Sequence, residues 1–180
     1  MKGAVFIALN DMVEEAYGIK AWEEILAQAK PESEGIYASA GSYKDEEIIA
    51  LLVALADVTD IDINEITRSF GNYLFKGLNS KFPIFANMYD NFFDFLCSIE
   101  GVIHKEVEKL YPNASLPKIQ CVRASERHIQ MLYSSPRKMC FLAEGLISGA
   151  AEHFKVHATI NQSKCCHRND DFCVIDIELT

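Results

Sequence analysis

The eight residues 172–179 read Phe-Cys-Val-Ile-Asp-Ile-Glu-Leu, and they decide the fold class. Apolar side chains occupy every second position of this stretch, opposite Asp176 and Glu178. The apolar face consists of Cys173, Ile175, Ile177 and Leu179. A period of two residues is typical of a β-strand with one buried and one exposed face. The stretch therefore predicts a strand of a half-buried antiparallel sheet.

More sheet elements are expected just upstream. Ile129, Met131 and Tyr133 alternate along another strand, and residues 156–160 suit a third. Between these strands, residues 138–154 have the spacing of a helix. The last third of the chain thus predicts a small antiparallel sheet with one helix packed on it.

The first two thirds of the chain have helical spacing instead. Apolar residues recur at that spacing over residues 5–16, and Gly18 is suited to end the helix. A second, short helix is expected before Pro31. We expect Asp45 to be the N-cap of a third helix, which contains the apolar run 48–56.

Two further helices complete this part. Asp62 followed by Glu65 resembles a capping box, and another helix is expected from about residue 91 to 110. Pro112 and Pro117 then interrupt the helical pattern. The order of elements predicts an α+β fold, with a helical N-terminal part followed by the sheet.

Length and composition limit the function. The chain has 180 residues, a common size for one domain, and no long linker or repeat divides it, so residues 1–180 are expected to form a single domain. A net charge of −9 disfavours binding to nucleic acid or anionic lipid. The longest apolar run, residues 48–56, is too short to span a membrane, which requires about 20 residues. We therefore expect a cytoplasmic protein with no membrane partner.

The cytoplasmic assignment bears on the cysteines. The chain has six of them, at positions 97, 121, 140, 165, 166 and 173. Because the cytoplasm is reducing, we expect them to be mostly thiols or metal ligands rather than disulfides. Several cysteines near the C-terminus, with His167 among them, could provide soft ligands for tetrahedral zinc. Ordinary thiols, which could be redox-active, are the alternative.

A polar cluster follows the strand that contains Tyr133. Tyr133, Ser135 and Arg137 lie on one side if the segment stays extended, and Pro136 favours that conformation at the residue before it. An arginine with two hydroxyls suits a ligand that bears carboxylates or phosphates. The alternative is a strand end whose arginine forms only a surface salt bridge.

His104 is the second polar feature. On the helix expected at 91–110, the core stripe is formed by Ile99, Ile103, Val107 and Leu110. His104 lies off the centre of that stripe and shares another strip with Phe93, Cys97 and Gly101. Gly101 removes a side chain one turn before the histidine, where a flat ligand could approach. The alternative is a partly exposed histidine without a role. Phosphate loops, His-Glu-x-x-His and Gly-x-Ser-x-Gly motifs do not occur in the sequence.

Taken together in order, these residues resemble the H-NOX family, the haem–nitric oxide/oxygen sensors related to the haem domain of soluble guanylate cyclase. The resemblance spans essentially the whole chain and is most specific where Tyr133-x-Ser135-x-Arg137 follows an upstream helical His104. It also rests on the following stretches: Met1-Lys2-Gly3, Leu9 to Met12, Phe70-Gly71, Val102-Ile103-His104, Pro117 and Gly145-Leu146-Ile147-x-Gly149.

The resemblance implies a non-covalently bound b-type haem (haem b) and a role for each matching residue. His104 matches the axial ligand of the iron. Tyr133, Ser135 and Arg137 match the trio that holds the haem propionates, and Pro117 matches a proline that presses on the macrocycle. The residues expected to line the haem pocket are Val5, Leu9, Leu74, Leu142 and Leu146.

The resemblance also implies a ligand set for zinc, because some bacterial members have a site of three cysteines and one histidine near the C-terminus. Cys140, Cys165 and Cys173 match the three cysteines. The position of the histidine is occupied here by Gln162. His167 or Cys166 is the candidate for the fourth ligand.

The implied function is that of a gas sensor and not of an enzyme. Oxygen-binding relatives have a distal tyrosine, whose position corresponds to Leu142 here, so we expect nitric oxide and carbon monoxide to bind and oxygen to be excluded. The chain contains no effector domain, and family resemblance implies a separate partner, a histidine kinase or a cyclic-di-GMP enzyme. The competing hypothesis is a zinc- or thiol-based redox adaptor without haem.

Overall fold

The computed structural model describes residues 1–111 and 114–180, and its elements follow the predicted order of helices first and strands later. Pro112, expected to interrupt the helices, lies outside the described residues. The α-helices are α1 (Gly3–Tyr17), α2 (Ile19–Ala29), α3 (Asp45–Thr59), α4 (Ile63–Lys81), α5 (Ile84–Asn87), α6 (Phe92–Ser98), α7 (His104–Leu110) and α8 (Cys140–His153). The strands are β1 (Lys118–Arg123), β2 (His128–Ser134), β3 (Ala158–Lys164) and β4 (Cys173–Leu179). The mixed α+β class is as predicted.

The sheet is antiparallel throughout and has the strand order β1-β2-β4-β3. Its central pair places Ile129 opposite Ile177, and both side chains are fully buried. The predicted period of two is confirmed along β2, whereas β4 alternates only from Ile175 onward, because Val174 is buried as well. The third strand begins at Ala158 and continues to Lys164, later and further than the predicted 156–160. The edge strand β1 was not predicted, because its burial does not alternate completely.

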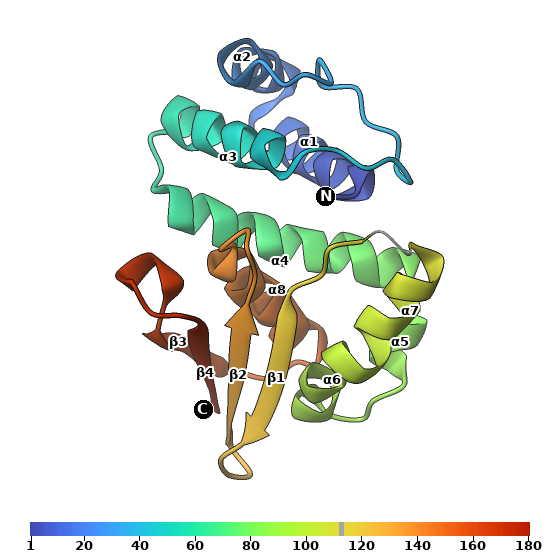
Figure 1. The fold of residues 1–180 in the computed structure, drawn as a ribbon, viewed down its shortest axis with the longest axis vertical. Helices are drawn as coiled ribbons and strands as arrows, with labels where there is room; N and C mark the ends of the chain where they lie inside the picture. The colour runs from blue at the N-terminus through green and yellow to red at the C-terminus, as the bar shows by residue number, and fades with distance from the viewer. Residues whose placement is uncertain (112–113) are drawn as a thin grey trace.

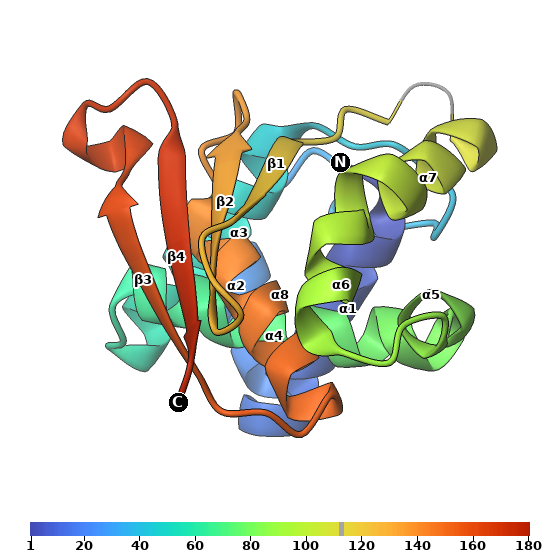
Figure 2. The ribbon, with the colours of Figure 1, turned by 90° about the horizontal axis from the view of Figure 1, so that it is seen from below.

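Helix α8 packs between the sheet and α4, while α1, α2 and α3 form a layer on the other side of α4 (Figures 1 and 2). Glycines allow the close approach of α4 and α8: a Cβ on Gly145 would lie 2.8 Å from the Cα of Gly71. Two apolar clusters result, one around α1 to α4 and one between α8 and the sheet, and Leu146 contacts both.

The ends of two helices test the capping predictions. Asp62 is confirmed as the N-cap of α4, since its side chain accepts hydrogen bonds from the backbone N–H groups of Asn64 and Glu65. Asp45 is not an N-cap, so that prediction was wrong: Lys44 occupies the position and Asp45 lies in the first turn of α3. The carboxylate of Asp45 is engaged instead by the N-terminal ammonium of Met1, a long-range contact that local sequence does not reveal.

The helix expected over residues 91–110 is divided into three pieces. Between α6 and α7, Ile99–Ile103 forms a π-helical turn, η1. This turn rotates the helix surface, so the stripe predicted from uniform spacing does not hold, and Leu110 at its end is 65% exposed. Single π turns inside helices occur frequently at functional sites.

The prediction that the cysteines are thiols or metal ligands was wrong for one pair, because a disulfide joins Cys97 on α6 to Cys121 on β1. The pairing depends on β1 lying beside α6, and β1 was not predicted. The other four cysteines are free.

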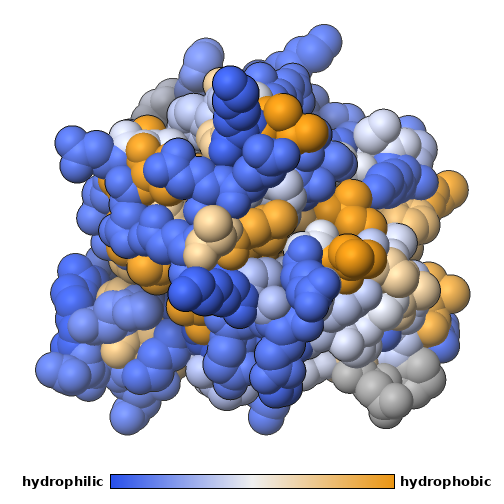
Figure 3. Space-filling model, turned by 90° about the horizontal axis from the view of Figure 1, so that it is seen from above, coloured by the Kyte–Doolittle hydropathy of each residue, from blue (hydrophilic) through white to orange (hydrophobic). Residues whose placement is uncertain are grey.

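Within the described residues, no helix is both long and apolar enough to cross a membrane. The face over the α1–α3 layer is mainly hydrophilic, with separate apolar patches between the polar side chains (Figure 3).

Candidate functional site

His104 lies where the π-helical turn η1 passes into α7. Its backbone N–H bonds to the carbonyl of Ile99, five residues back, which is the hydrogen bond of a π turn. The imidazole is 14% exposed although no residue of α7 itself is buried. The turn therefore holds a mostly shielded imidazole on an otherwise accessible helix.

Glu100 orients the imidazole. Its Oε2 atom is 2.9 Å from Nδ1 of His104 and also accepts a hydrogen bond of 3.1 Å from the backbone N–H of Ile119 on β1. A carboxylate accepts rather than donates, so we assign the ring proton to Nδ1, which leaves the lone pair on Nε2. Among residues 1–111 and 114–180, no protein group bonds to Nε2. A ring nitrogen fixed in this way is typical of a histidine that binds a metal.

The functional importance of Glu100 was missed at the sequence level. The signal was present, since an acidic residue four positions before a helical histidine lies on the same face of the helix. Its second contact, with Ile119, could not be anticipated without the unpredicted strand β1.

The polar trio lies at the end of β2 and in the turn after it. Tyr133 is 5% exposed, and burial raises the pKa of its hydroxyl to about 12, partly offset by a hydrogen bond with Ser135. The hydroxyl is therefore a hydrogen-bond donor at neutral pH. Ser135 Oγ in turn accepts a hydrogen bond of 3.3 Å from the backbone N–H of Arg137. The structure thus brings the three residues together.

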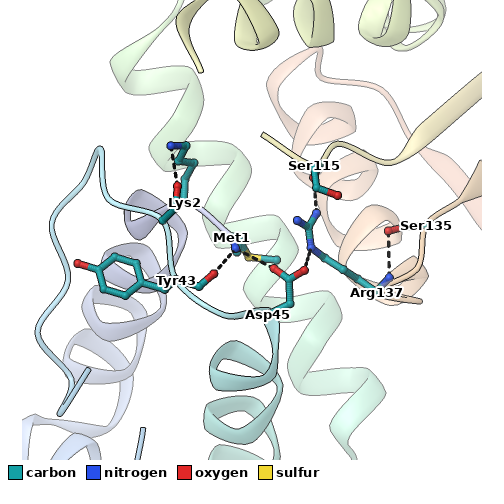
Figure 4. A network of polar contacts seen from close by, with 8 residues as sticks. Met1, Lys2, Tyr43, Asp45, Ser115, Ser135 and Arg137 are labelled. Atoms are coloured by element: carbon teal, nitrogen blue, oxygen red, sulfur yellow. Dashed lines mark hydrogen bonds and ion pairs between the residues drawn. The ribbon is translucent and has the colours of Figure 1, made fainter. Parts of the chain in front are cut away.

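Arg137 is a largely buried cation, only 12% exposed, rather than a surface residue. Figure 4 shows its guanidinium between Asp45 and the backbone carbonyl of Ser115, while Asp45 also binds the ammonium of Met1. Nε lies 2.6 Å from Asp45 Oδ2, close enough for an ion pair, but its N–H is not directed at any acceptor among the described residues. The side chain therefore retains an unsatisfied buried donor.

The same contacts set the charge of Asp45. Burial alone would raise the pKa of its carboxyl, but the hydrogen bond from the Met1 ammonium and the positive charge of the Arg137 guanidinium lower that pKa below its ordinary value. Asp45 is thus ionised at neutral pH and links the N-terminus, α3 and the end of β2.

The predicted pocket residues converge from three helices. Leu9 on α1, Leu74 on α4 and Leu142 on α8 are buried in one cluster, and Val5 and Leu146 pack against it. Every one of these side chains is apolar. Pro117 is partly buried and directly precedes β1.

This set of groups fits a haem. Nε2 of His104 can serve as an axial ligand, the buried donor of Arg137 can receive a carboxylate, and the leucines provide apolar surface for a porphyrin. Gly101, one turn before the histidine, is exposed, and a Cβ there would meet no atom within 4 Å.

Four cysteines form a second candidate site. The sulfur atoms of Cys140, Cys165, Cys166 and Cys173 all lie within 4.8 Å of one another. Two of the contacts are short, 3.8 Å between Cys140 and Cys165 and 3.4 Å between Cys173 and Cys166. Burial raises the pKa values of Cys140 and Cys173. Four thiols at these distances have the number and type of ligands of a structural zinc site.

Of the two candidates for the fourth zinc ligand, Cys166 lies in this cluster and His167 does not. Nε2 of His167 is 2.7 Å from the backbone carbonyl of Lys138, and its ring stacks on Phe141. Gln162, at the position of the family's histidine, has a buried side-chain amide without a hydrogen-bond partner among the described residues.

Comparisons with known proteins show which family the chain belongs to. A family model described as Haem-NO-binding matches residues 2–162. The chain is similar to an H-NOX protein from Shewanella oneidensis, solved in its Fe(II)NO state, with 38% identity over 100% of this chain and 99% of the other and a TM-score of 0.93. It is also similar to an unliganded Fe(II) H-NOX protein from K. algicida, with 31% identity, coverage of 100% and 97%, and a TM-score of 0.92. A solution structure of the Shewanella oneidensis domain in the Fe(II)CO state matches with a TM-score of 0.90, 38% identity and coverage of 100% and 99%.

Proposed function

Because the chain belongs to the haem–NO-binding family, whose H-NOX domains are sensors and not enzymes, we propose that it binds haem b and reports nitric oxide to a separate protein. The observation that supports this most directly is the geometry of His104, whose Nδ1 is fixed by Glu100 while Nε2 remains available. When bound, the haem supplies a ferrous iron to which nitric oxide or carbon monoxide binds. The whole chain, residues 1–180, is proposed to act as one sensor domain.

The protein groups have separate tasks in this proposal. His104 holds the iron, and Glu100 keeps the imidazole in the tautomer that permits this. The Tyr133 hydroxyl and the Arg137 guanidinium bind the propionates, with Ser135 supporting both through its hydroxyl. Pro117, at the start of β1, is proposed to press on the macrocycle.

Gas selectivity is proposed to follow from the composition of the apolar cluster. Oxygen bound to ferrous haem carries partial negative charge and gains roughly 1.5–3 kcal/mol from a hydrogen-bond donor. Leu142 occupies the position where such a donor would be placed, and its companions Leu9 and Leu74 are apolar and buried as well. Nitric oxide and carbon monoxide bind strongly without a donor, so the pocket favours them over oxygen.

The proposed partner is a histidine kinase or a cyclic-di-GMP enzyme, as family resemblance implies. An acidic protein of net charge −9 is poorly suited to nucleic acid, which leaves a protein as the recipient of the signal. A gas can influence that partner only if it favours one of two conformations of the sensor.

Visible spectra of the purified protein test the proposal. The reduced protein should have a haem spectrum that changes on addition of nitric oxide or carbon monoxide and stays unchanged in air until oxidation begins. In His104→Gly, haem content should collapse and be restored by added imidazole. Lys105→Gly, which carries the same backbone change one residue away, is the control. Normal haem content in His104→Gly without imidazole would contradict the assignment.

A second proposal concerns the four cysteines. We propose that Cys140, Cys165, Cys166 and Cys173 bind one zinc ion, because their sulfur atoms lie within 4.8 Å of one another. Metal analysis of protein purified under reducing conditions should give about one zinc per chain. Zinc should be lost in Cys166→Ser and retained in His167→Ala. Retention of zinc in Cys166→Ser would exclude this ligand set. A zinc-containing protein that never binds haem would favour the redox-adaptor hypothesis.

A further inference from the structure

The disulfide between Cys97 and Cys121 lies outside both proposed binding sites. It joins α6 to the edge strand β1, with 5.1 Å between the two Cα atoms, and the two cysteines are 24 positions apart in sequence. Cys97 is exposed and Cys121 is partly exposed, so small thiols and disulfides in solution can reach the bond. Accessible disulfides are the ones that are readily reduced and often regulatory.

The loop that this disulfide closes contains the proximal side of the candidate haem site. Glu100, His104 and Pro117 all lie between Cys97 and Cys121 in the sequence. We propose that Cys97 and Cys121 form a reversible thiol–disulfide pair that regulates how freely the His104 segment moves. The regulatory part rests on the proposed function of His104, whereas the redox reaction itself does not.

The other polar contacts across this junction are weak. Arg123 on β1 pairs with Asp94 on α6 at 3.2 Å, but both side chains are about half exposed. Glu100 accepts one hydrogen bond from the backbone of Ile119. Exposed ion pairs restrain a structure little because water competes for both charges. Apolar packing also holds this junction, because α6 and Ile119 belong to one cluster, and the disulfide adds a covalent restraint between α6 and β1 that reduction removes.

The reaction balances with glutathione disulfide as the oxidant. The thiolate of Cys97, the more exposed of the two residues, attacks glutathione disulfide, forms a mixed disulfide and releases one glutathione. The Cys121 thiolate then attacks the Cys97 sulfur and releases the second glutathione. Two electrons pass from the cysteines to glutathione disulfide, and the two thiol protons end on the released glutathiones. Reduced glutathione reverses both steps.

A redox titration of the full-length haem-loaded protein tests the chemistry. Protein equilibrated in glutathione buffers of increasing oxidation is quenched with an alkylating reagent, and intact mass gives the number of free thiols. Two thiols should disappear together in the wild type, and peptide mapping should assign them to Cys97 and Cys121. In Cys97→Ser and in Cys121→Ser this two-thiol step should be absent. Ser98→Ala, an equally small change one residue away, should retain it.

The second measurement is the rate at which nitric oxide dissociates from the same samples, with the thiol state verified by mass after haem reduction. Oxidised and reduced wild type should differ by roughly fivefold or more, the lower end of the usual coupling between two sites. Cys97→Ser and Cys121→Ser should each give one rate at every redox setting. Equal rates for oxidised and reduced wild type would overturn the regulatory role.

A pair that stays fully reduced, or fully oxidised, in every glutathione buffer would overturn the reversible redox reaction. Failure of the proposed function would appear differently, because haem would not bind while the thiol titration still showed the two-thiol step.

Discussion

Replacement of Glu100 by alanine should weaken haem binding, although Glu100 is not expected to touch the haem. The change removes the acceptor that fixes Nδ1 of His104 at 2.9 Å and frees the N–H of Ile119. A hydrogen bond to a charged group contributes about 1.5–3 kcal/mol when well shielded. The Glu100 side chain is 48% exposed, so water can replace part of the contact and the lower end applies. A loss of about 1.4 kcal/mol corresponds to roughly tenfold weaker retention of the haem.

The assay is the transfer of haem from the protein to an excess of apomyoglobin, followed by absorbance. Glu100→Ala should release haem roughly tenfold faster than wild type. Glu100→Gln keeps an oxygen acceptor without the charge and should lie in between. Resonance Raman spectra should also show a lower iron–imidazole stretching frequency in Glu100→Ala, because the imidazole loses basicity.

Glu106→Ala is the matched control for this prediction. Glu106 lies on α7 beyond the histidine, is 44% exposed and pairs only with Lys109 among the described residues. Its removal changes the local charge equally but leaves the imidazole untouched. The reasoning would be refuted if Glu106→Ala and Glu100→Ala released haem at the same rate, or if neither differed from wild type.

Three further predictions follow from the same geometry. Arg137→Ala leaves a propionate without its buried cation, which should cost about 2–5 kcal/mol of haem-binding free energy. Haem should then transfer to apomyoglobin at least ~30-fold faster, and an unchanged rate would exclude the propionate role. The Asp45 carboxyl has a lowered pKa, so it stabilises the fold above its ordinary pKa of 3.8 and loses that effect as the pH falls through the folded-state pKa. The difference in unfolding free energy between wild type and Asp45→Asn, measured by urea unfolding, should therefore shrink below about pH 4. A difference that stays constant with pH would contradict this. Gly145→Ala would place a Cβ 2.0 Å from the Arg68 carbonyl oxygen and should destabilise the fold by about 1–3 kcal/mol or more. Gly77→Ala, whose Cβ would meet no atom within 4 Å, should leave stability unchanged or raise it by up to ~1 kcal/mol. Thermal unfolding of both variants measures the difference.

The regular parts of the fold could be predicted because their signals are local. The alternation in β2 and in the second half of β4 arises from one more buried and one more exposed face. Asp62 caps α4 with bonds to residues two and three positions later. Such contacts are contained within a short window of sequence. β1 has no complete alternation, and the register that pairs it with β2 is a long-range property.

The errors in the prediction have a common physical origin. Asp45 has the composition of an N-cap, but an ammonium 44 residues away in sequence captures its carboxylate. The segment 91–110 has helical spacing, and the π turn at Ile99–Ile103 divides it although a single glycine, Gly101, does not by itself predict such a turn. The disulfide of Cys97 depends on β1. In each case a tertiary contact overrides the local preference.

The candidate haem site was accessible to sequence reasoning for a different reason. The Tyr-x-Ser-x-Arg pattern and a helical histidine are specific only in combination, and a family resemblance supplies that combination. The supporting residues lie outside such motifs: Glu100 acts through His104, and Asp45 acts through Arg137. A motif therefore identifies the groups expected to touch a ligand, while the groups that orient them become visible only in three dimensions.

The location of these groups explains how a small ligand could influence the whole domain. Arg137 follows the sheet, yet its ion-pair partner Asp45 belongs to α3 and binds the chain's own N-terminus. Leu146 packs against both apolar clusters. A haem bound by His104 and by Arg137 would therefore contact groups from the helical layer and from the sheet region at once. Any change in its position must be accommodated by movement of one part relative to the other, because packed cores shift between discrete arrangements rather than deform continuously.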